Sequence, residues 1–88
     1  MKAPAMKVTI KYFASIREAI GQRSELRDTA AANLAGLRDE LLAASPAHAA
    51  SLARGKSVRM ALNQVMSEES AALSDGCEVA FFPPVTGG

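Results

Sequence analysis

The feature that most limits the fold is a single long amphipathic helix set among short segments of alternating polarity. Its apolar stripe repeats at helical spacing and consists of Leu34, Leu37, Leu41 and Ala44. One stripe must be buried against an apolar surface, and alternating strands supply it because every second side chain points to the same face. The pattern therefore predicts an α+β domain of two layers, with the main helix packed across one face of a sheet.

The ends of the helical segments carry recognisable signals. Asn33 is a favourable N-cap for the main helix, and Pro46 ends it or opens the next turn. Arg38 is expected on the polar side of that helix, away from the stripe. A second short helix is predicted over the alanine-rich residues 47–53, where His48 is interpreted as a surface histidine.

The clearest strand covers residues 6–13. Met6, Val8, Ile10 and Tyr12 share one face, whereas Phe13 belongs by parity to the opposite face, with the lysines. A capping box from Ser15 to Glu18 then predicts a short helix over residues 16–20, stopped by Gly21.

The remaining segments predict further strands around the first. Residues 24–28 form a weak strand that pairs with the first strand as a hairpin. Residues 57–62 and 65–66 form two strands joined by a tight turn at Asn63–Gln64. Leu73 is expected to fill the core, and a turn at Asp75–Gly76 leads into the last strand, residues 77–82.

Composition excludes several classes of protein. The 88 residues allow one small domain, and its apolar content is inflated by 18 alanines. One Cys and one His provide neither an internal disulfide nor a Cys/His zinc site, so no metal is expected. A net charge of +1 indicates no nucleic-acid partner. No apolar run reaches the roughly 20 residues of a membrane span, and the start lacks a secretory pattern, so we expect a cytoplasmic protein.

Catalytic side chains are scarce, which disfavours a self-sufficient enzyme. Cys77 shares a strand face with Val79 and Phe81, so it is interpreted as a small buried hydrophobe. Glu68 and Glu69 are interpreted as a solvated loop rather than an acid–base pair.

The segment after the last strand has an unusual composition. Pro83 and Pro84 favour an extended path, Val85 and Thr86 follow, and Gly87 and Gly88 carry no side chains. Fully extended, residues 83–88 reach at most about 20 Å. This shape suits the delivery of a terminal carboxylate into a narrow slot of another protein. A carboxylate is inert until it is activated, for instance as a mixed anhydride with AMP.

A contact surface is expected beside this tail. Phe82 lies on the polar face of the last strand, as Phe13 does on the first, so the two rings meet if these strands are neighbours. Met66 is a further exposed apolar candidate. An apolar patch on so small a protein usually marks an interaction site.

These residues carry a resemblance to a known family. Residues 75–88 (DGCEVAFFPPVTGG) resemble the carboxyl end of the molybdopterin synthase small subunit, a ubiquitin-like sulfur carrier. Lys11–Ala14 with Arg17–Glu18, and Leu62–Gln64, add to the similarity. The resemblance implies a β-grasp fold with a mixed sheet of four to five strands and one main helix. It divides the chain into an extension (1–5), the β-grasp domain (6–82) and the Gly-Gly tail (83–88).

The resemblance also implies a chemistry for the tail. An adenylating enzyme related to those that activate ubiquitin uses ATP to adenylate Gly88, and a sulfurtransferase or cysteine desulfurase system supplies the sulfur of a thiocarboxylate. The tail then enters the large subunit and gives sulfur to cyclic pyranopterin monophosphate, forming the dithiolene of molybdopterin. Two small and two large subunits are expected, with no stably bound cofactor on this chain. Phe13, Met66 and Phe82 match the family's apolar contact surface, and residues 83–86 lead to Gly87 and Gly88.

Two departures from the family pattern leave this role intact. Cys77 stands where an acidic residue is common, and residues 1–5 are an extension. The alternatives are a carrier of the same fold for thiamine or another sulfur pathway, and a ubiquitin-like interaction module with an inert tail. The run from Phe82 to Thr86, preceded by Phe81, favours the molybdopterin role over the thiamine role.

Overall fold

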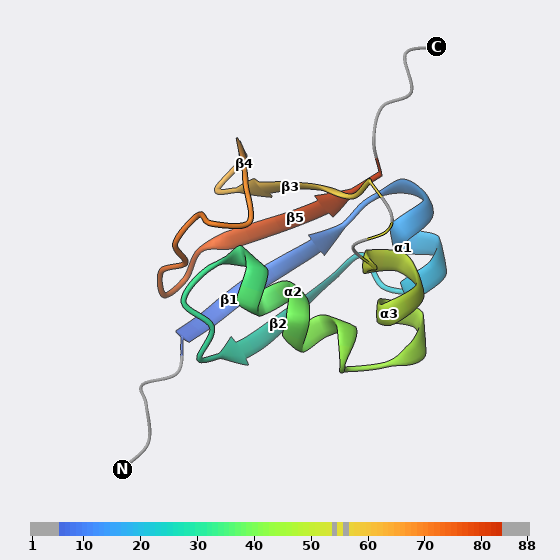
Figure 1. The fold of residues 1–88 in the computed structure, drawn as a ribbon, viewed down its shortest axis with the longest axis horizontal. Helices are drawn as coiled ribbons and strands as arrows, with labels where there is room; N and C mark the ends of the chain where they lie inside the picture. The colour runs from blue at the N-terminus through green and yellow to red at the C-terminus, as the bar shows by residue number, and fades with distance from the viewer. Residues whose placement is uncertain (1–5, 54, 56, 84–88) are drawn as a thin grey trace.

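The computed structural model describes residues 6–53, 55 and 57–83 (Figure 1). Strands and helices follow one another in the order β1 (Met6–Tyr12), α1 (Ala14–Ile20), β2 (Ser24–Thr29), α2 (Leu34–Leu42), α3 (Pro46–Leu52), β3 (Arg59–Leu62), β4 (Val65–Ser67) and β5 (Glu78–Phe82). In this described part, no helix is long and apolar enough to cross a membrane.

The strands form one mixed sheet in the order β2-β1-β5-β3-β4. β1 and β5 lie at its centre and run parallel, with Ile10 opposite Val79, whereas the other neighbouring strands are antiparallel. The helix α2 crosses one side of the sheet (Figure 1). The predicted two-layer architecture and the predicted pairing of the first two strands are therefore confirmed.

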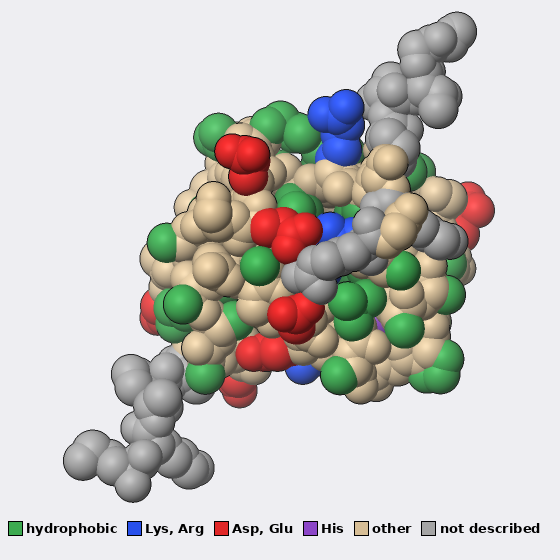
Figure 2. All heavy atoms as spheres, in the orientation of Figure 1, with side chains coloured by type: hydrophobic (Ala, Val, Ile, Leu, Met, Phe, Trp, Pro, Cys, Tyr) green, Lys and Arg blue, Asp and Glu red, His purple; other side chains and the backbone are tan. Residues whose placement is uncertain are grey.

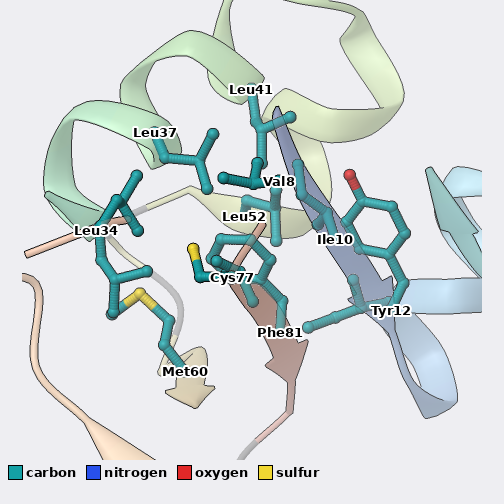
Figure 3. Close-up of a cluster of buried hydrophobic side chains, with 13 residues drawn as sticks. Val8, Ile10, Tyr12, Leu34, Leu37, Leu41, Leu52, Met60, Cys77 and Phe81 are labelled. Carbon is teal, nitrogen blue, oxygen red and sulfur yellow. The ribbon is translucent and has the colours of Figure 1, made fainter. Parts of the chain in front are cut away.

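The core lies between the sheet and the helices. Leu34, Leu37 and Leu41 point from α2 toward the inward face of β1 (Figure 3). Leu73 and Cys77 belong to the same buried cluster, as predicted. Ala44 does not, because α2 ends at Leu42 and leaves Ala44 exposed in the following turn. Leu52 of α3 contributes to the cluster instead.

Caps and turns explain where most elements begin and end. The Asn33 side chain accepts a hydrogen bond from the Gly36 N–H at 2.9 Å, as an N-cap should. Ser45 caps α3 in the same way, with Pro46 in its first turn. Asn63 and Gln64 both take positive φ, 51° and 69°, which suits a tight hairpin turn and confirms the prediction.

The capping box predicted for α1 is wrong. The helix begins at Ala14, one residue before Ser15, because the extended Phe13 serves as its N-cap. The Phe13 carbonyl accepts hydrogen bonds from the N–H groups of Ile16 and Arg17. The predicted stop is confirmed, since Gly21 takes a φ of 85° and its N–H donates to the Arg17 carbonyl at 2.8 Å.

The interpretation of His48 as a surface residue is also wrong. Its side chain is only 7% exposed, because α3 folds back so that the imidazole meets the ring of Tyr12 edge-on. The Nε2 atom lies 3.4 Å from Oε2 of Glu25 on β2. Burial, and then the negative charge of Glu25, raise the pKa of the Tyr12 hydroxyl far above its usual value. Tyr12 therefore stays neutral at physiological pH.

Arg38 likewise departs from the expectation that it faces solvent. It is 3% exposed and donates hydrogen bonds from Nε to the Leu52 carbonyl at 2.7 Å and from Nη2 to the Ala53 carbonyl at 3.0 Å. Its Nη1 also pairs with Glu69 at 3.1 Å. Both carbonyls lie at the end of α3, where a helix leaves acceptors without helical partners. Arg38 thus supplies hydrogen-bond donors to the carbonyls at the end of α3 and connects α3 to α2.

We predict that Arg38→Met lowers the free energy of unfolding by about 2–4 kcal/mol, because two carbonyls and Glu69 lose their buried partner. Arg27→Met is the matched control. Its half-exposed pair with Glu40 should contribute less than about 1 kcal/mol. Urea unfolding followed by circular dichroism measures both, and equal losses would contradict the assigned role of Arg38.

Candidate functional site

The face of the sheet opposite the helices, here called the open face, carries a row of side chains across four strands. The pairing register places Lys11 beside Ala80, Ala80 beside Ala61, and Ala61 beside Met66. The two alanines are small, so they leave the larger side chains around them to project from the sheet. The row therefore joins β1 to β4 as one shallow surface with an apolar centre.

Phe13 and Phe82 meet at one end of this surface. Their ring centroids lie 6.3 Å apart and the rings are nearly perpendicular, an edge-to-face contact. The Phe13 N–H also donates to the Phe81 carbonyl at 3.2 Å, which extends the parallel pairing of β1 and β5. The contact predicted from strand parity is confirmed. We call these two residues the ring pair. Phe13 remains 44% exposed, so it is available to a partner.

Met66 lies on the edge strand β4 and is 54% exposed, as expected for a contact residue. Sequence reasoning missed a further exposed apolar side chain, Leu26, which is 69% exposed on β2 opposite Thr9. Its neighbours Glu25 and Arg27 turn toward the helix side, where they meet His48 and Glu40. The sequence held one signal for this exposure. Glu25 and Arg27 flank Leu26, so if these charged residues face the helices, Leu26 must face the opposite side of the sheet.

The tail leaves the sheet beside the ring pair. Pro83 follows directly after β5 and helps to line a cleft of about 280 Å³ with Ile16 and Ala19 of α1, Ser51 of α3, and Val58. The other predicted tail residues, Pro84, Val85, Thr86, Gly87 and Gly88, lie outside the described residues, as does the extension 1–5. The root of the tail is thus placed at the end of the sheet where Phe82 contacts Phe13.

The polar groups near this surface form a structural contact. Lys11 and Glu78 form an ion pair at 3.3 Å, and both side chains are partly exposed, so the pair contributes little stability. Across the described ranges, no three His, Cys, Asp or Glu side chains gather as metal ligands would. The arrangement offers a docking surface and a chain exit, which are binding features.

Comparison with solved structures places the fold among ubiquitin-like proteins. The chain superposes on SAMP1 from Haloferax volcanii with a TM-score of 0.75 and 27% identity, covering 93% of this chain and 99% of that one. An archaeal ubiquitin from Caldiarchaeum subterraneum matches with a TM-score of 0.57 over 97% of this chain and 100% of that one, at 15% identity. The ThiS family matches residues 10–88, and the chain belongs to this family.

Curated relatives are similar over nearly their whole length. The molybdopterin synthase sulfur carrier subunit of Escherichia coli is 39% identical over 83 residues, covering 92% of this chain and 99% of that protein. The protein of the same name from Haemophilus influenzae is 35% identical, covering 92% and 99%. A solved complex of subunits 1 and 2 of the molybdopterin-converting factor of Helicobacter pylori contains a chain that matches with a TM-score of 0.64 and 27% identity, covering 94% of this chain and 100% of that one.

We predict that Phe13→Ala lowers the free energy of unfolding by less than about 1.5 kcal/mol, because its ring is largely exposed and loses mainly the contact with Phe82. Phe81→Ala, which removes a fully buried ring, should cost about 3–5 kcal/mol. Denaturant titration of both variants tests this. A large loss for Phe13→Ala would mean that the ring pair supports the fold rather than a partner contact.

Proposed function

We propose that this chain is the sulfur-carrier subunit of a molybdopterin synthase, with Gly88 as the group that carries sulfur. The observation that carries the proposal is the similarity, at 35–39% identity and over nearly full length, to proteins named molybdopterin synthase sulfur carrier subunit. The exposed ring pair next to the root of the tail supports it, because a carrier must be held while its tail is used.

The proposed cycle has three steps. In the first, an adenylating enzyme joins the Gly88 carboxylate to the α-phosphate of ATP, and pyrophosphate leaves. Next, the persulfide of a sulfurtransferase or cysteine desulfurase system attacks the acyl carbon, and AMP leaves. A thiol then cleaves the resulting acyl disulfide, which forms a disulfide with the donor cysteine and releases the thiocarboxylate. Finally, the thiocarboxylate gives its sulfur to cyclic pyranopterin monophosphate on the large subunit, and water restores the carboxylate. ATP is consumed by the adenylating enzyme, and no stably bound cofactor is assigned to this chain.

The residues of this chain contribute position rather than catalysis. Gly87 and Gly88 carry no side chains, so they admit the acyl carbon to a narrow active site on each partner. Pro83 and Pro84 favour an extended backbone, and Val85 and Thr86 add length before Gly87. The groups that activate and accept the acyl carbon belong to the partners. We place this cycle in the cytoplasm.

The large subunit is the proposed partner of the open face. The Helicobacter pylori complex of subunits 1 and 2 supports this pairing, since one of its chains shares the present fold. We assign Phe13, Phe82 and Met66 to the contact, with an assembly of two small and two large subunits. The exposure of Phe13 and Met66 supports the assignment, because both side chains gain from being covered.

Intact mass spectrometry tests the carrier role directly. After incubation with the adenylating enzyme, ATP and a sulfur donor, we expect the mass of the chain to rise by the difference between one sulfur and one oxygen atom. A variant with one alanine appended after Gly88 should fold normally and stay unmodified. An unchanged mass of the native chain, in a reaction that converts an established sulfur carrier, would contradict the proposal.

The ring pair gives a second test. Phe82→Ala should weaken binding to the large subunit by about 10- to 100-fold, since buried aromatic anchors often contribute most to an interface. Leu26→Ala is the matched control, because Leu26 is an exposed apolar residue on the edge strand β2, two strands away from Phe82 on β5. Isothermal titration calorimetry measures both affinities. If Phe82→Ala binds the large subunit with native affinity, the ring pair is not part of the interface.

A further inference from the structure

A cleft with a strongly basic lining lies next to the ring pair. It measures about 350 Å³ and is lined by Lys11, Tyr12, Phe13, Arg17, Arg23 and Ser24. Three of these side chains are cationic, and none is a carboxylate. Because Phe13 belongs both to this lining and to the ring pair, the basic cleft continues the apolar contact surface without a break.

The local backbone explains why these cations gather. Arg17 lies in the last turn of α1, and Gly21 then reverses the chain through its positive φ. The reversal brings Arg23 alongside the end of β1, where its carbonyl accepts a hydrogen bond from the Tyr12 N–H at 2.9 Å. Lys11 reaches the same place from β1, opposite Ser24. Two segments joined by a tight turn thus bring three positive charges to one site.

Two of these three charges have no ion-pair partner among the described residues. Arg17 and Arg23 are exposed, and neither forms an ion pair with any carboxylate of the described ranges. Lys11 alone is paired, with Glu78. Arg27 and Arg38 differ, since Arg27 pairs with Glu40 and Arg38 with Glu69.

Acidic side chains are conspicuous on the helix side of the molecule (Figure 2). With a net charge of only +1, the chain is not basic throughout, so the basic cleft is a local feature. Arg17 and Arg23 lie at the end of the sheet that also carries the root of the tail.

We propose that Arg17, Arg23 and Lys11 form an electrostatic docking site for carboxylate side chains on the large subunit that receives the tail. This inference rests on the proposed function, which requires such a protein. Guanidinium groups bind carboxylates in a planar, bidentate geometry, so they fix orientation as well as attract. The ring pair supplies apolar contact, and the neighbouring cations turn the incoming domain so that its tail faces the entrance of the acceptor.

The size of the site favours a protein over a nucleic acid. Two exposed arginines and one lysine that already pairs with Glu78, in a chain of net charge +1, match a few carboxylates better than a phosphate backbone. Exposed charges of this kind act mainly on the rate of association, because solvent screening limits their contribution to final affinity.

The experiment compares the double variant Arg17→Gln/Arg23→Gln with the control Lys7→Gln. Lys7 is an exposed lysine on the same strand as Lys11, but at the opposite end, opposite Asp28. Stopped-flow or surface plasmon resonance measures association with the purified large subunit and, separately, with the adenylating enzyme, at low and high salt. We expect the double variant to associate about tenfold more slowly with the large subunit at low salt, and its salt dependence to flatten. Lys7→Gln should match the native chain.

Native association rates of the double variant with the large subunit would overturn the docking site, as would an equal loss for Lys7→Gln. A different result would point to a nucleic acid as the partner. In that case the native chain is retained on a DNA column, the double variant is not, and the double variant still associates with both proteins at native rates. Thiocarboxylate formation at saturating adenylating enzyme separates the two proposals. A native chain that becomes thiocarboxylated, with no charge dependence of association, refutes only the docking site, whereas a native chain that neither binds nor is modified refutes both.

Discussion

The parallel pairing of β1 with β5 is the interaction on which the rest of the structure depends. It joins the first and last strands at the centre of the sheet, so every other element forms part of the connection between them. Parallel strands end at the same edge, and this brings Phe13 and Phe82 together although 68 residues separate them. The root of the tail is therefore held beside the ring pair by the same backbone hydrogen bonds that form the core of the sheet.

The two faces of this sheet divide the work between stability and recognition. The inward face buries Val8, Ile10 and Phe81 against the leucines of α2, which is where most of the apolar burial lies. The open face leaves Phe13 and Met66 exposed, at the expense of burial that a domain of this size could use. Buried polar contacts of Arg38 and His48 hold α3 in place and complete the helical layer.

Sequence patterns anticipated the elements whose signals are local. Alternation predicted β1 and β5, and Asn33 marked the start of α2, because strand parity and capping depend only on residues a few positions apart. The errors concern environments made by distant segments. His48 and Arg38 looked solvent-exposed, but each is enclosed where α3 folds back on elements far along the chain. Ser15 has the spacing of a cap, yet the parallel pairing that ends at Phe13 sets the start of α1 at Ala14, two residues earlier than predicted.

The sequence by itself determined the strand faces, the main helix, and a tail whose prolines and glycines restrict or free the backbone without help from tertiary contacts. It also indicated that Phe13 and Phe82 would meet if their strands were neighbours. Only the tertiary structure decided that they are neighbours and that Arg17, Arg23 and Lys11 share one cleft. The physical reason is that strand order and chain reversal depend on how much apolar surface the whole chain buries. That total area cannot be read from any one segment.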